Sequence, residues 1–316
     1  MPAPQDVVQS VPLTSFAIGY RPGKFIASEV IPDLPVVAKT GPYYIMNKDN
    51  LIKENDGPRS PRDPARELDY QLTTATYDIE RYNLKELLPD EEANNFAMGP
   101  DAAAEAVSQN LMDRLLIGKE YRASALLFST ANITNNTTLT TTAQWSDYGN
   151  SDPISDIETG VGSTEDSTAM PAAELSVTMG NAVWRQLKHH PNIVARYQYT
   201  AGGGVTVAQF AALFGLKPEN VHLGASKYNS ATEGQTATLT NLWGRGFLVH
   251  YTDPAPTGVR TLTLAGNFTY PSGRGVKVDI WRSNDPDGDW QRDEINYDQR
   301  VVAADAGYYI HTPIAA

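Results

Sequence analysis

The chain of 316 residues contains no cysteine. This absence excludes disulfides, thiolate metal sites and cysteine nucleophiles together, and it is typical of a protein made in a reducing cytoplasm. The chain also has no apolar run near the ~18 residues that a membrane-spanning helix needs. Its N-terminus lacks the basic start and apolar core of a secretory signal. We therefore expect no membrane partner.

Positive charge is scarce: 25 Lys and Arg residues stand against 37 Asp and Glu residues, for a formal net charge of -12. A dedicated nucleic-acid binder needs a basic face that releases counterions, so this class is excluded. An acidic protein can still lie beside DNA without adhering to it. The content of 41% hydrophobic and 20% charged residues is ordinary for a globular protein, and the length predicts one large domain or two interlocked domains.

Signatures of catalysis and of cofactor binding are missing as well. The sequence contains no G-x-S-x-G, and no G-x-G-x-x-G follows a predicted strand. The glycine triplet at residues 202–204 lacks the Gly-Lys-Ser/Thr ending of a phosphate-binding loop, so it is interpreted as a connector. We expect no catalytic residue, no cofactor and no enzyme activity.

Metal ligands are not grouped at useful spacings. Histidine occurs at five scattered or adjacent positions, namely His189, His190, His222, His250 and His311. Asp285, Asp287 and Asp289 imitate the start of a calcium loop, but the twelfth position is Asn296, where a bidentate Glu belongs. The stretch is therefore predicted to be a solvated turn between strands, with an incidental divalent ion as the alternative.

Residues 1–34 are punctuated by prolines, which disfavour helix interiors and central strands, so an extended N-terminal arm is predicted. The arm carries too many apolar residues for a solvated tail, and a disordered terminus is the alternative. We expect it to lie against another surface. Phe16, Phe25 and Ile26 are its candidate contacts with other subunits.

Two strand-like runs, residues 34–46 and 66–82, flank a polar stretch rich in Gly and Pro and predict a long β-hairpin. Arms of about 12–15 residues would reach ~40–50 Å. A two-stranded ribbon of that length is not stable alone in water, so either the rest of the chain or another subunit must cover it. Charged residues near its tip are candidate intersubunit contacts, with a solvated loop as the alternative: Glu54, Asp56, Arg59, Arg62, Asp63 and Arg66.

Residues 101–129 give the strongest helix signal. Pro100 suits a first turn, and Val107, Leu111 and Leu115 recur at helical spacing. Such a helix is ~43 Å long. The second half of the chain mixes short helices and strands without a fixed-period repeat, so the fold class is α+β.

This order of elements resembles the major capsid proteins of tailed phages with the Hong Kong 97-type (HK97-like) fold. The resemblance rests on residues 25–48, on the helix after FAMGPDAAAEA, on SDPISDIETG before MGNAVWRQLKHHPNI, and on VVAADAGYYI near the end. It covers roughly residues 20–312 and implies the following map: an N-terminal arm (1–34), an extended loop (β-hairpin, 35–85), a peripheral domain (86–145 and 247–300) with a spine helix at about 101–129, and an axial domain (146–246 and 301–316).

The resemblance also implies a structural, non-enzymatic virion protein that self-assembles into hexamers and pentamers of an icosahedral shell. The shell would enclose double-stranded DNA without specific recognition and would be assembled in the bacterial host cytoplasm. A separate scaffolding protein, a portal and, as an option, a decoration protein would be its partners. One alternative is an encapsulin-like nanocompartment subunit. An alternative of another class is a soluble enzyme or carbohydrate-binding β-rich protein.

Overall fold

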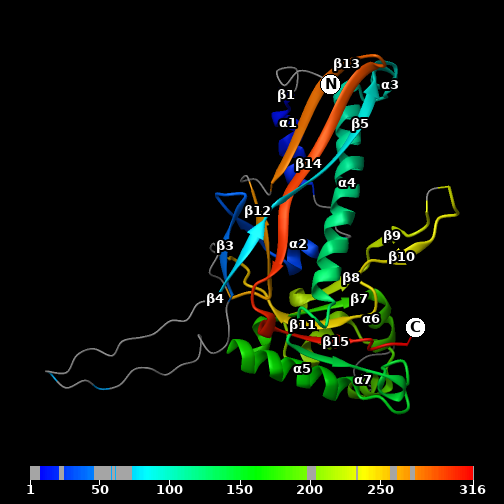
Figure 1. Cartoon of the computed structure of the whole chain (residues 1–316). Coiled ribbons are helices and arrows are strands. Elements are labelled where there is room, and N and C mark those ends of the chain that lie inside the picture. The colour runs from blue at the N-terminus through cyan, green and yellow to red at the C-terminus, as the bar shows by residue number, and fades with distance from the viewer. Residues whose placement is uncertain are drawn as a thin grey trace.

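A computed structural model describes residues 8–20, 25–45, 58, 61, 73–197, 204–232, 234–256, 262–270 and 275–315. The fold is α+β, as expected. A long upper part pairs a twisted sheet with one long helix, and a lower part packs short helices on a second sheet (Figure 1). None of the helices in these ranges is both long and apolar enough to cross a bilayer.

The upper sheet is built around one central strand, β14, which pairs antiparallel with β13 and β12 on one side and with β5 on the other. The strands of the upper sheet are β1 (Val8–Gln9), β2 (Asp33–Pro35), β5 (Glu80–Pro89), β12 (Ala265–Thr269), β13 (Val276–Asn284) and β14 (Asp287–Val301). Asp285 and Pro286 join β13 to β14 and are exposed. The prediction of a solvated turn at this point is confirmed.

Helix α4 (Pro100–Leu127) lies along the upper sheet and confirms the helix predicted at 101–129. Proline in its first turn removes no helical hydrogen bond, because the first N–H groups have no partner within a helix. The apolar face of α4 supplies Met112 and Leu115 to a cluster with Val278 and Ile295 of the sheet. Helix α3 (Asp90–Asn95) precedes α4 and contacts it.

The lower sheet has the order β6-β15-β11-β7-β8. Its strands are β6 (Asn135–Thr138), β7 (Leu175–Gly180), β8 (Val221–Gly224), β11 (Phe247–Tyr251) and β15 (Gly307–His311). The helices that pack against it are α5 (Pro153–Thr168), α6 (Asn181–Leu187), α7 (Pro191–Arg196) and α8 (Val207–Leu213). Short 3₁₀ turns span Thr141–Ala143, Ala172–Glu174, Pro218–Asn220 and Ala304–Ala306.

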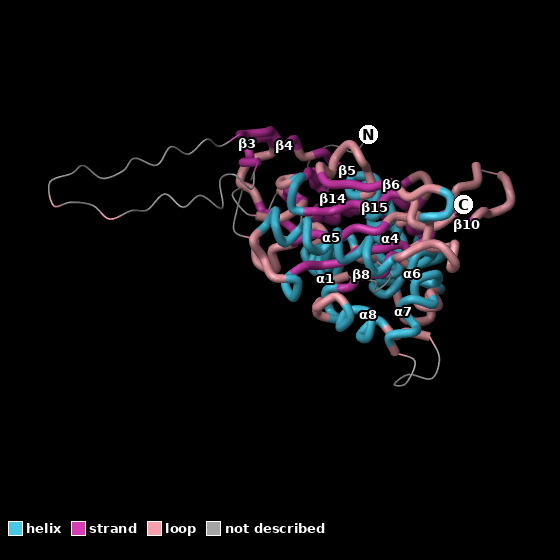
Figure 2. Tube along the Cα trace, turned by 90° about the horizontal axis from the view of Figure 1, so that it is seen from below, coloured by secondary structure: helices cyan, strands magenta, loops and turns pink. Residues whose placement is uncertain are grey.

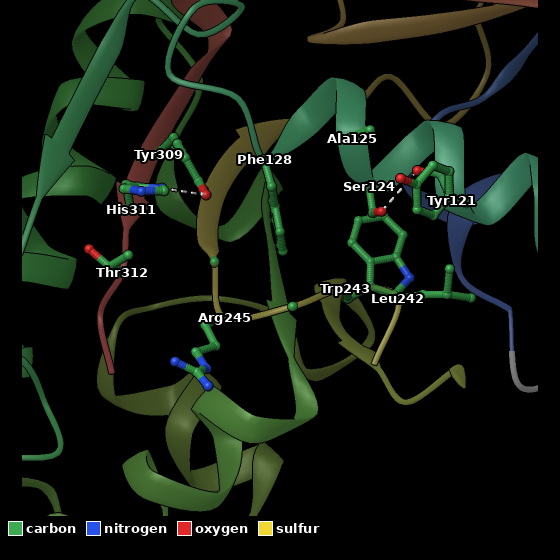
Figure 3. A pocket seen from close by; sticks show the side chains of 12 residues that line it. Tyr121, Ser124, Ala125, Phe128, Leu242, Trp243, Arg245, Tyr309, His311 and Thr312 are labelled. Atoms are coloured by element: carbon green, nitrogen blue, oxygen red, sulfur yellow. Dashed lines mark hydrogen bonds between the residues drawn. The ribbon is translucent and has the colours of Figure 1, made fainter. Parts of the chain in front are cut away.

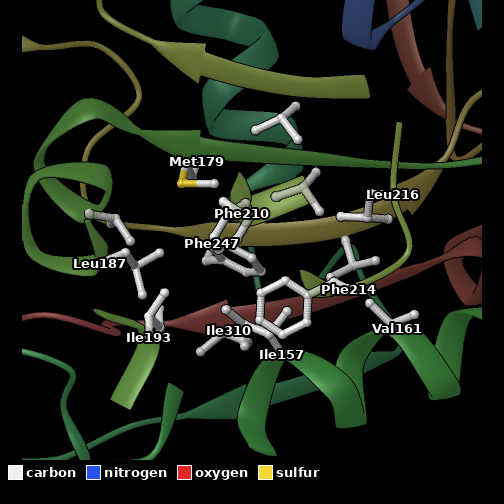
Figure 4. Packing of buried hydrophobic residues seen from close by; sticks show 14 of the residues in the cluster. Ile157, Val161, Met179, Leu187, Ile193, Phe210, Phe214, Leu216, Phe247 and Ile310 are labelled. Carbon is white, nitrogen blue, oxygen red and sulfur yellow. The ribbon is translucent and has the colours of Figure 1, made fainter. Parts of the chain in front are cut away.

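The core of the lower part lies between this sheet and its helices (Figure 4). Ile157 of α5, Phe210 of α8 and Phe247 of β11 are fully buried in it. All six residues of β7 are buried, because other strands cover both its edges and side chains cover both its faces. This cluster is the largest apolar core in the described part of the chain.

The expectation of a fully extended arm is wrong. Residues Val11–Gly19 form helix α1 and Ala27–Val30 form the short helix α2. Pro12 falls in the first turn of α1, where its missing N–H is harmless, and Ser10 caps the helix by accepting a hydrogen bond from Leu13 N–H at 3.4 Å. The described part of the arm therefore packs on its own chain.

Glycine at position 224 provides a test of packing at the end of β8. A Cβ there would lie 2.2 Å from Cγ of the buried Trp243. We expect Gly224→Ala to lower the free energy of unfolding by about 1–3 kcal/mol through overpacking. Gly162→Ala is the matched control, since a Cβ at this position on α5 meets nothing within 4 Å. The control should gain up to about 1 kcal/mol in helix propensity. Equal denaturant midpoints for the two variants would contradict this packing.

Asp293 provides a test of how β14 contacts α4. The buried carboxylate accepts hydrogen bonds from Ser108 Oγ at 2.6 Å and Gln291 Nε2 at 3.2 Å, and burial raises its pKa to about 6. The ordinary Asp pKa is about 3.9. Between about pH 4 and pH 6 the folded state therefore binds a proton that the unfolded state does not bind. The unfolding free energy of the wild type relative to Asp293→Asn should therefore rise by about 2–3 kcal/mol as pH falls from 8 to 4. A pH-independent difference in denaturant titrations would contradict the shift.

Candidate assembly surfaces

One buried carboxylate joins the arm, α4 and the lower part of the molecule. Glu120 on α4 is 1% exposed and accepts hydrogen bonds from the backbone N–H groups of Ile26 (3.0 Å) and Ala27 (2.9 Å). It also accepts from Nε1 of Trp243 at 2.5 Å and from Oγ of Ser226 at 3.4 Å. Burial raises the pKa of Glu120, and these hydrogen bonds oppose the shift. The contacts hold the start of α2 against α4.

The neighbouring residue on α4 holds the next part of the arm. Lys119 is 6% exposed, and its Nζ lies 3.4 Å from Oδ1 of Asp33 and 3.4 Å from Oγ of Ser28. Asp33 begins β2 and also accepts from the side-chain amide of Asn267 on β12 at 2.5 Å. The arm thus has a fixed path from α2 into the upper sheet.

The predicted hairpin is present at its base as β3 (Thr40–Ile45) and β4 (Thr73–Asp78), paired antiparallel. Tyr43 and Tyr77 are buried there, with ring centroids 5.1 Å and 4.7 Å from that of Phe268. The root of this ribbon is therefore covered by its own chain. The six charged candidates of the hairpin, Glu54, Asp56, Arg59, Arg62, Asp63 and Arg66, lie outside the described residues.

The three apolar candidates of the arm lie in different surroundings. Ile26 is 8% exposed and belongs to the cluster between the arm and α4, so within one subunit it is a core residue. Phe16 is half-buried and stacks on Tyr20 at 5.9 Å. Phe25 is half-buried as well. Phe16 and Phe25 therefore retain solvent-exposed side-chain area that another subunit could cover, whereas Ile26 retains little.

A groove lies at the top of the molecule between α3, the start of α4 and β5. It has a volume of about 230 Å³, with Leu88, Phe96 and Val107 as apolar lining and Glu86 and Glu92 as acidic lining. Met98, in the loop between α3 and α4, is 82% exposed. Sequence reasoning missed this surface, although the apolar residues of FAMG before Pro100 could have indicated it.

A second ribbon, formed by β9 (Lys227–Asn229) and β10 (Leu239–Asn241), projects from the body beside the C-terminal part of α4 (Figure 1). Tyr228 of this ribbon packs edge-on against Tyr121 of α4, with ring centroids 5.7 Å apart. This ribbon was not predicted, because its sequence is mostly polar and short.

A cavity of about 290 Å³ lies below the ribbon, between the end of α4 and β15 (Figure 3). Its lining includes the aromatic residues Tyr121, Phe128, Trp243 and Tyr309. Ser124 Oγ donates to the carbonyl of Tyr121 at 3.0 Å, and Nδ1 of His311 lies 3.2 Å from the hydroxyl of Tyr309. The described residues of this cavity therefore form no serine–histidine pair.

The buried histidines occupy structural positions. In His250, Nε2 lies 2.9 Å from Oγ1 of Thr178 and Nδ1 lies 2.8 Å from Oγ1 of Thr252, and burial lowers its pKa to about 3. His190 lies 3.0 Å from Oγ of Ser151 through Nε2, and burial lowers its pKa too. In the ranges that the structure describes, no three acidic or His side chains are grouped so that they could hold a metal.

Comparison with known proteins gives two curated relatives of nearly equal length, while no family model matches the chain. Both relatives are named major capsid protein. One, from Pseudomonas phage JBD67, is 28% identical over 312 residues and covers 96% of each chain. The other, from Burkholderia phage BcepMu, is 22% identical over 303 residues and covers 94% of each chain.

Solved structures resemble the whole chain. A phage-related protein from Bordetella bronchiseptica RB50 aligns with a TM-score of 0.80 at 19% identity, covering 98% of this chain and 99% of that one. The capsid of Cyanophage P-SCSP1u aligns with a TM-score of 0.58 at 12% identity, covering 93% and 89%. The chain has the HK97-type capsid fold. An encapsulin from Synechococcus elongatus aligns with a TM-score of 0.50 at 12% identity, covering 96% and 95%.

The predicted resemblance to tailed-phage major capsid proteins is thus confirmed, as is the interpretation of the chain as a capsid shell subunit. In such a subunit the surfaces that matter are those that meet other copies. The described molecule exposes two ribbons and the groove at α3.

The junction at Glu120 gives a prediction about the rigidity of the capsid subunit. Glu120→Gln replaces one acceptor oxygen by a donor that faces other donors, so we expect a loss of about 1–3 kcal/mol in unfolding free energy. The amides of Ile26 and Ala27 should also exchange hydrogen faster. Glu105→Gln is the control, because Glu105 is an exposed residue of the same helix. If both variants unfold and exchange like the wild type, the junction does not hold the arm.

Proposed function

We propose that this capsid subunit assembles with itself into hexamers and pentamers of an icosahedral shell that encloses double-stranded DNA, and that it catalyses no reaction. The observation that carries the proposal is the β3–β4 ribbon, whose described strands pair only with each other and leave the body at one side (Figures 1 and 2). One face of the ribbon packs on Phe268 through Tyr43 and Tyr77, while other residues of its strands, such as Thr74 and Thr76, stay exposed and could be covered by a neighbouring copy.

Charge supports a specific site for the tip of this ribbon. The segment from residue 58 to 66, PRSPRDPAR, contains Arg59, Arg62 and Arg66 against one Asp. The groove at α3 and β5 carries Glu86 and Glu92 beside apolar lining. We propose that the tip of one copy binds this groove on another copy, with ion pairs setting the register. Phe16 and Phe25 are proposed as secondary contacts.

We also propose that the inner wall of the shell does not bind the DNA that the shell encloses. The net charge of -12 supports this. Helix α5 gives a local example, since Asp152 at its start and Glu158 and Asp166 along it are exposed and its sequence contains no Lys or Arg. Packed DNA next to such a surface would be repelled, and no specific recognition is required.

The domain map belongs to the proposal as well. The arm would be residues 1–34, the extended loop 35–85, the peripheral domain 86–145 with 247–300, and the axial domain 146–246 with 301–316. Assembly is proposed to occur in the bacterial cytoplasm with a separate scaffolding protein and a portal, and with a decoration protein as an option. The packing of α4 on the upper sheet supports a separate peripheral part. Strands β6 and β11 depart from the proposed ranges, because they lie within 86–145 and 247–300 but pair with β15 and β7 in the lower sheet.

The encapsulin likeness favours one second candidate, a nanocompartment that encloses a cargo enzyme. The contents of purified particles discriminate between the two functions. Packaged nucleic acid supports a phage shell, and a co-purifying enzyme supports a nanocompartment. The earlier alternative of a soluble enzyme or carbohydrate-binding protein predicts a monomer or small oligomer in gel filtration.

Deletion of residues 47–65 tests the role of the ribbon. We expect a folded subunit that forms no stable shells, because the deleted segment would cover a neighbour while the roots of β3 and β4 stay packed through Tyr43 and Tyr77. Circular dichroism and thermal unfolding report folding, and negative-stain electron microscopy reports shells. Particles like those of the full-length chain would show that this segment is not an assembly element.

A further inference from the structure

The β9–β10 ribbon is a second projecting element, distinct from the β3–β4 ribbon and from the groove at α3. In the part of the chain that the structure describes, its two strands pair only with each other. The ribbon leaves the body on the side opposite to the β3–β4 ribbon, and both views agree on this (Figures 1 and 2). The molecule therefore has unlike projections on opposite edges.

The root of the β9–β10 ribbon is fixed, while its strands are exposed. Ser226, just before β9, donates to Glu120, and Leu242, just after β10, donates its N–H to the carbonyl of Ser226 at 3.0 Å. Leu239 on β10 is 66% exposed. Lys227 on β9 is exposed. The ribbon thus presents an apolar side chain and a cation in a defined position.

The opposite edge presents the complementary chemistry. Val37, in the turn between β2 and β3, is 97% exposed. Asp78 at the end of β4 and Glu80 at the start of β5 are exposed, and neither forms an ion pair with a described cation. Their carboxylates accept hydrogen bonds from the hydroxyls of Thr40 and Tyr82 instead. Val37, Asp78 and Glu80 are therefore exposed on this side, beside the exposed cations Lys39 and Arg81, of which Arg81 pairs with Glu294.

We infer that the β9–β10 ribbon of one copy contacts the β2–β3 turn and β4 of the next copy. Leu239 packs against Val37 of the second copy, and Lys227 lies near its Asp78 and Glu80. A contact between two unlike surfaces of the same chain is head-to-tail, and it closes into a ring when the rotation between copies divides a full turn. The inference rests on the proposed shell function and adds the lateral contact within each ring.

The absence of natural cysteine makes a cross-linking test direct. Leu239→Cys combined with Val37→Cys should give a ladder of covalent oligomers when assembled particles are oxidised or treated with a short bismaleimide, because a disulfide needs Cα atoms within roughly 7 Å. The single variants should give at most dimers. Leu239→Cys with Val8→Cys is the control, since Val8 is 65% exposed but lies on β1.

The outcomes separate this contact from the shell function. Particles that form normally but give no ladder, or give the same ladder with the Val8 control, overturn the contact and leave the shell intact. A wild-type chain that forms no particles under any assembly condition overturns the proposed function instead. A ladder specific to Leu239 and Val37 supports both.

Exchanging the charges of Lys227 and Asp78 tests the same contact independently if the cysteine variants assemble poorly. Lys227→Glu places like charges together and should lower particle yield roughly tenfold. Adding Asp78→Lys should restore the yield to within about twofold of wild type. The melting temperature of the unassembled subunits should change by only a few degrees, since both side chains are exposed and Asp78→Lys removes a single exposed hydrogen bond, from Thr40. Failure of the second substitution to restore the yield would contradict the proposed pairing.

Discussion

A carboxylate that is buried away from water needs hydrogen-bond donors around it. Glu120 is such a carboxylate, and it lies where the arm, α4 and the lower part of the molecule meet. Glu120 itself lies on α4, and its donors come from the arm, from Ser226 before β9 and from Trp243 before β11. Oε1 is shared by Ile26, Ser226 and Trp243, and Oε2 accepts from the N–H of Ala27, so departure of the arm would leave Oε2 without its donor. The register of the arm, the long helix and the lower sheet is therefore set at one point.

This constraint explains how a chain with projecting ribbons can serve as a rigid building block. The ribbons leave a body whose arm is fastened by Glu120 and by the contact of Lys119 with Asp33. A shell needs the same contact geometry at each repeat, and small angular errors at the root of a ribbon would prevent closure. Rigidity at the root and exposure at the strands are both required, and the β9–β10 ribbon has both.

Sequence patterns predicted the elements whose signals are local. Pro100 and the apolar spacing of Leu111 and Leu115 identified α4, and the Asp-rich turn after β13 was recognised from its composition. Helix α1 was missed, because a proline count does not distinguish a first turn from a helix interior. The long strand β14 was obscured by its charges, since Asp293 and Glu294 are buried against partners that only the fold brings together.

The assembly surfaces were harder to predict than the fold. The six charged residues of the hairpin lie outside the described residues, and Ile26 proved to be a core residue. The groove at α3 and the β9–β10 ribbon were not foreseen, because each is assembled from segments distant in sequence or from short polar strands. An interface depends on which side chains remain exposed after folding, and this cannot be read from a local pattern.

The central claim is that this folded subunit is completed by copies of itself. Sedimentation velocity of the purified wild-type chain, under conditions that promote assembly, tests it most directly. The account predicts a discrete, fast-sedimenting species that electron microscopy resolves as closed shells, far larger than the 34.5 kDa subunit. A single slow boundary at the monomer mass at every concentration and solution condition would contradict it.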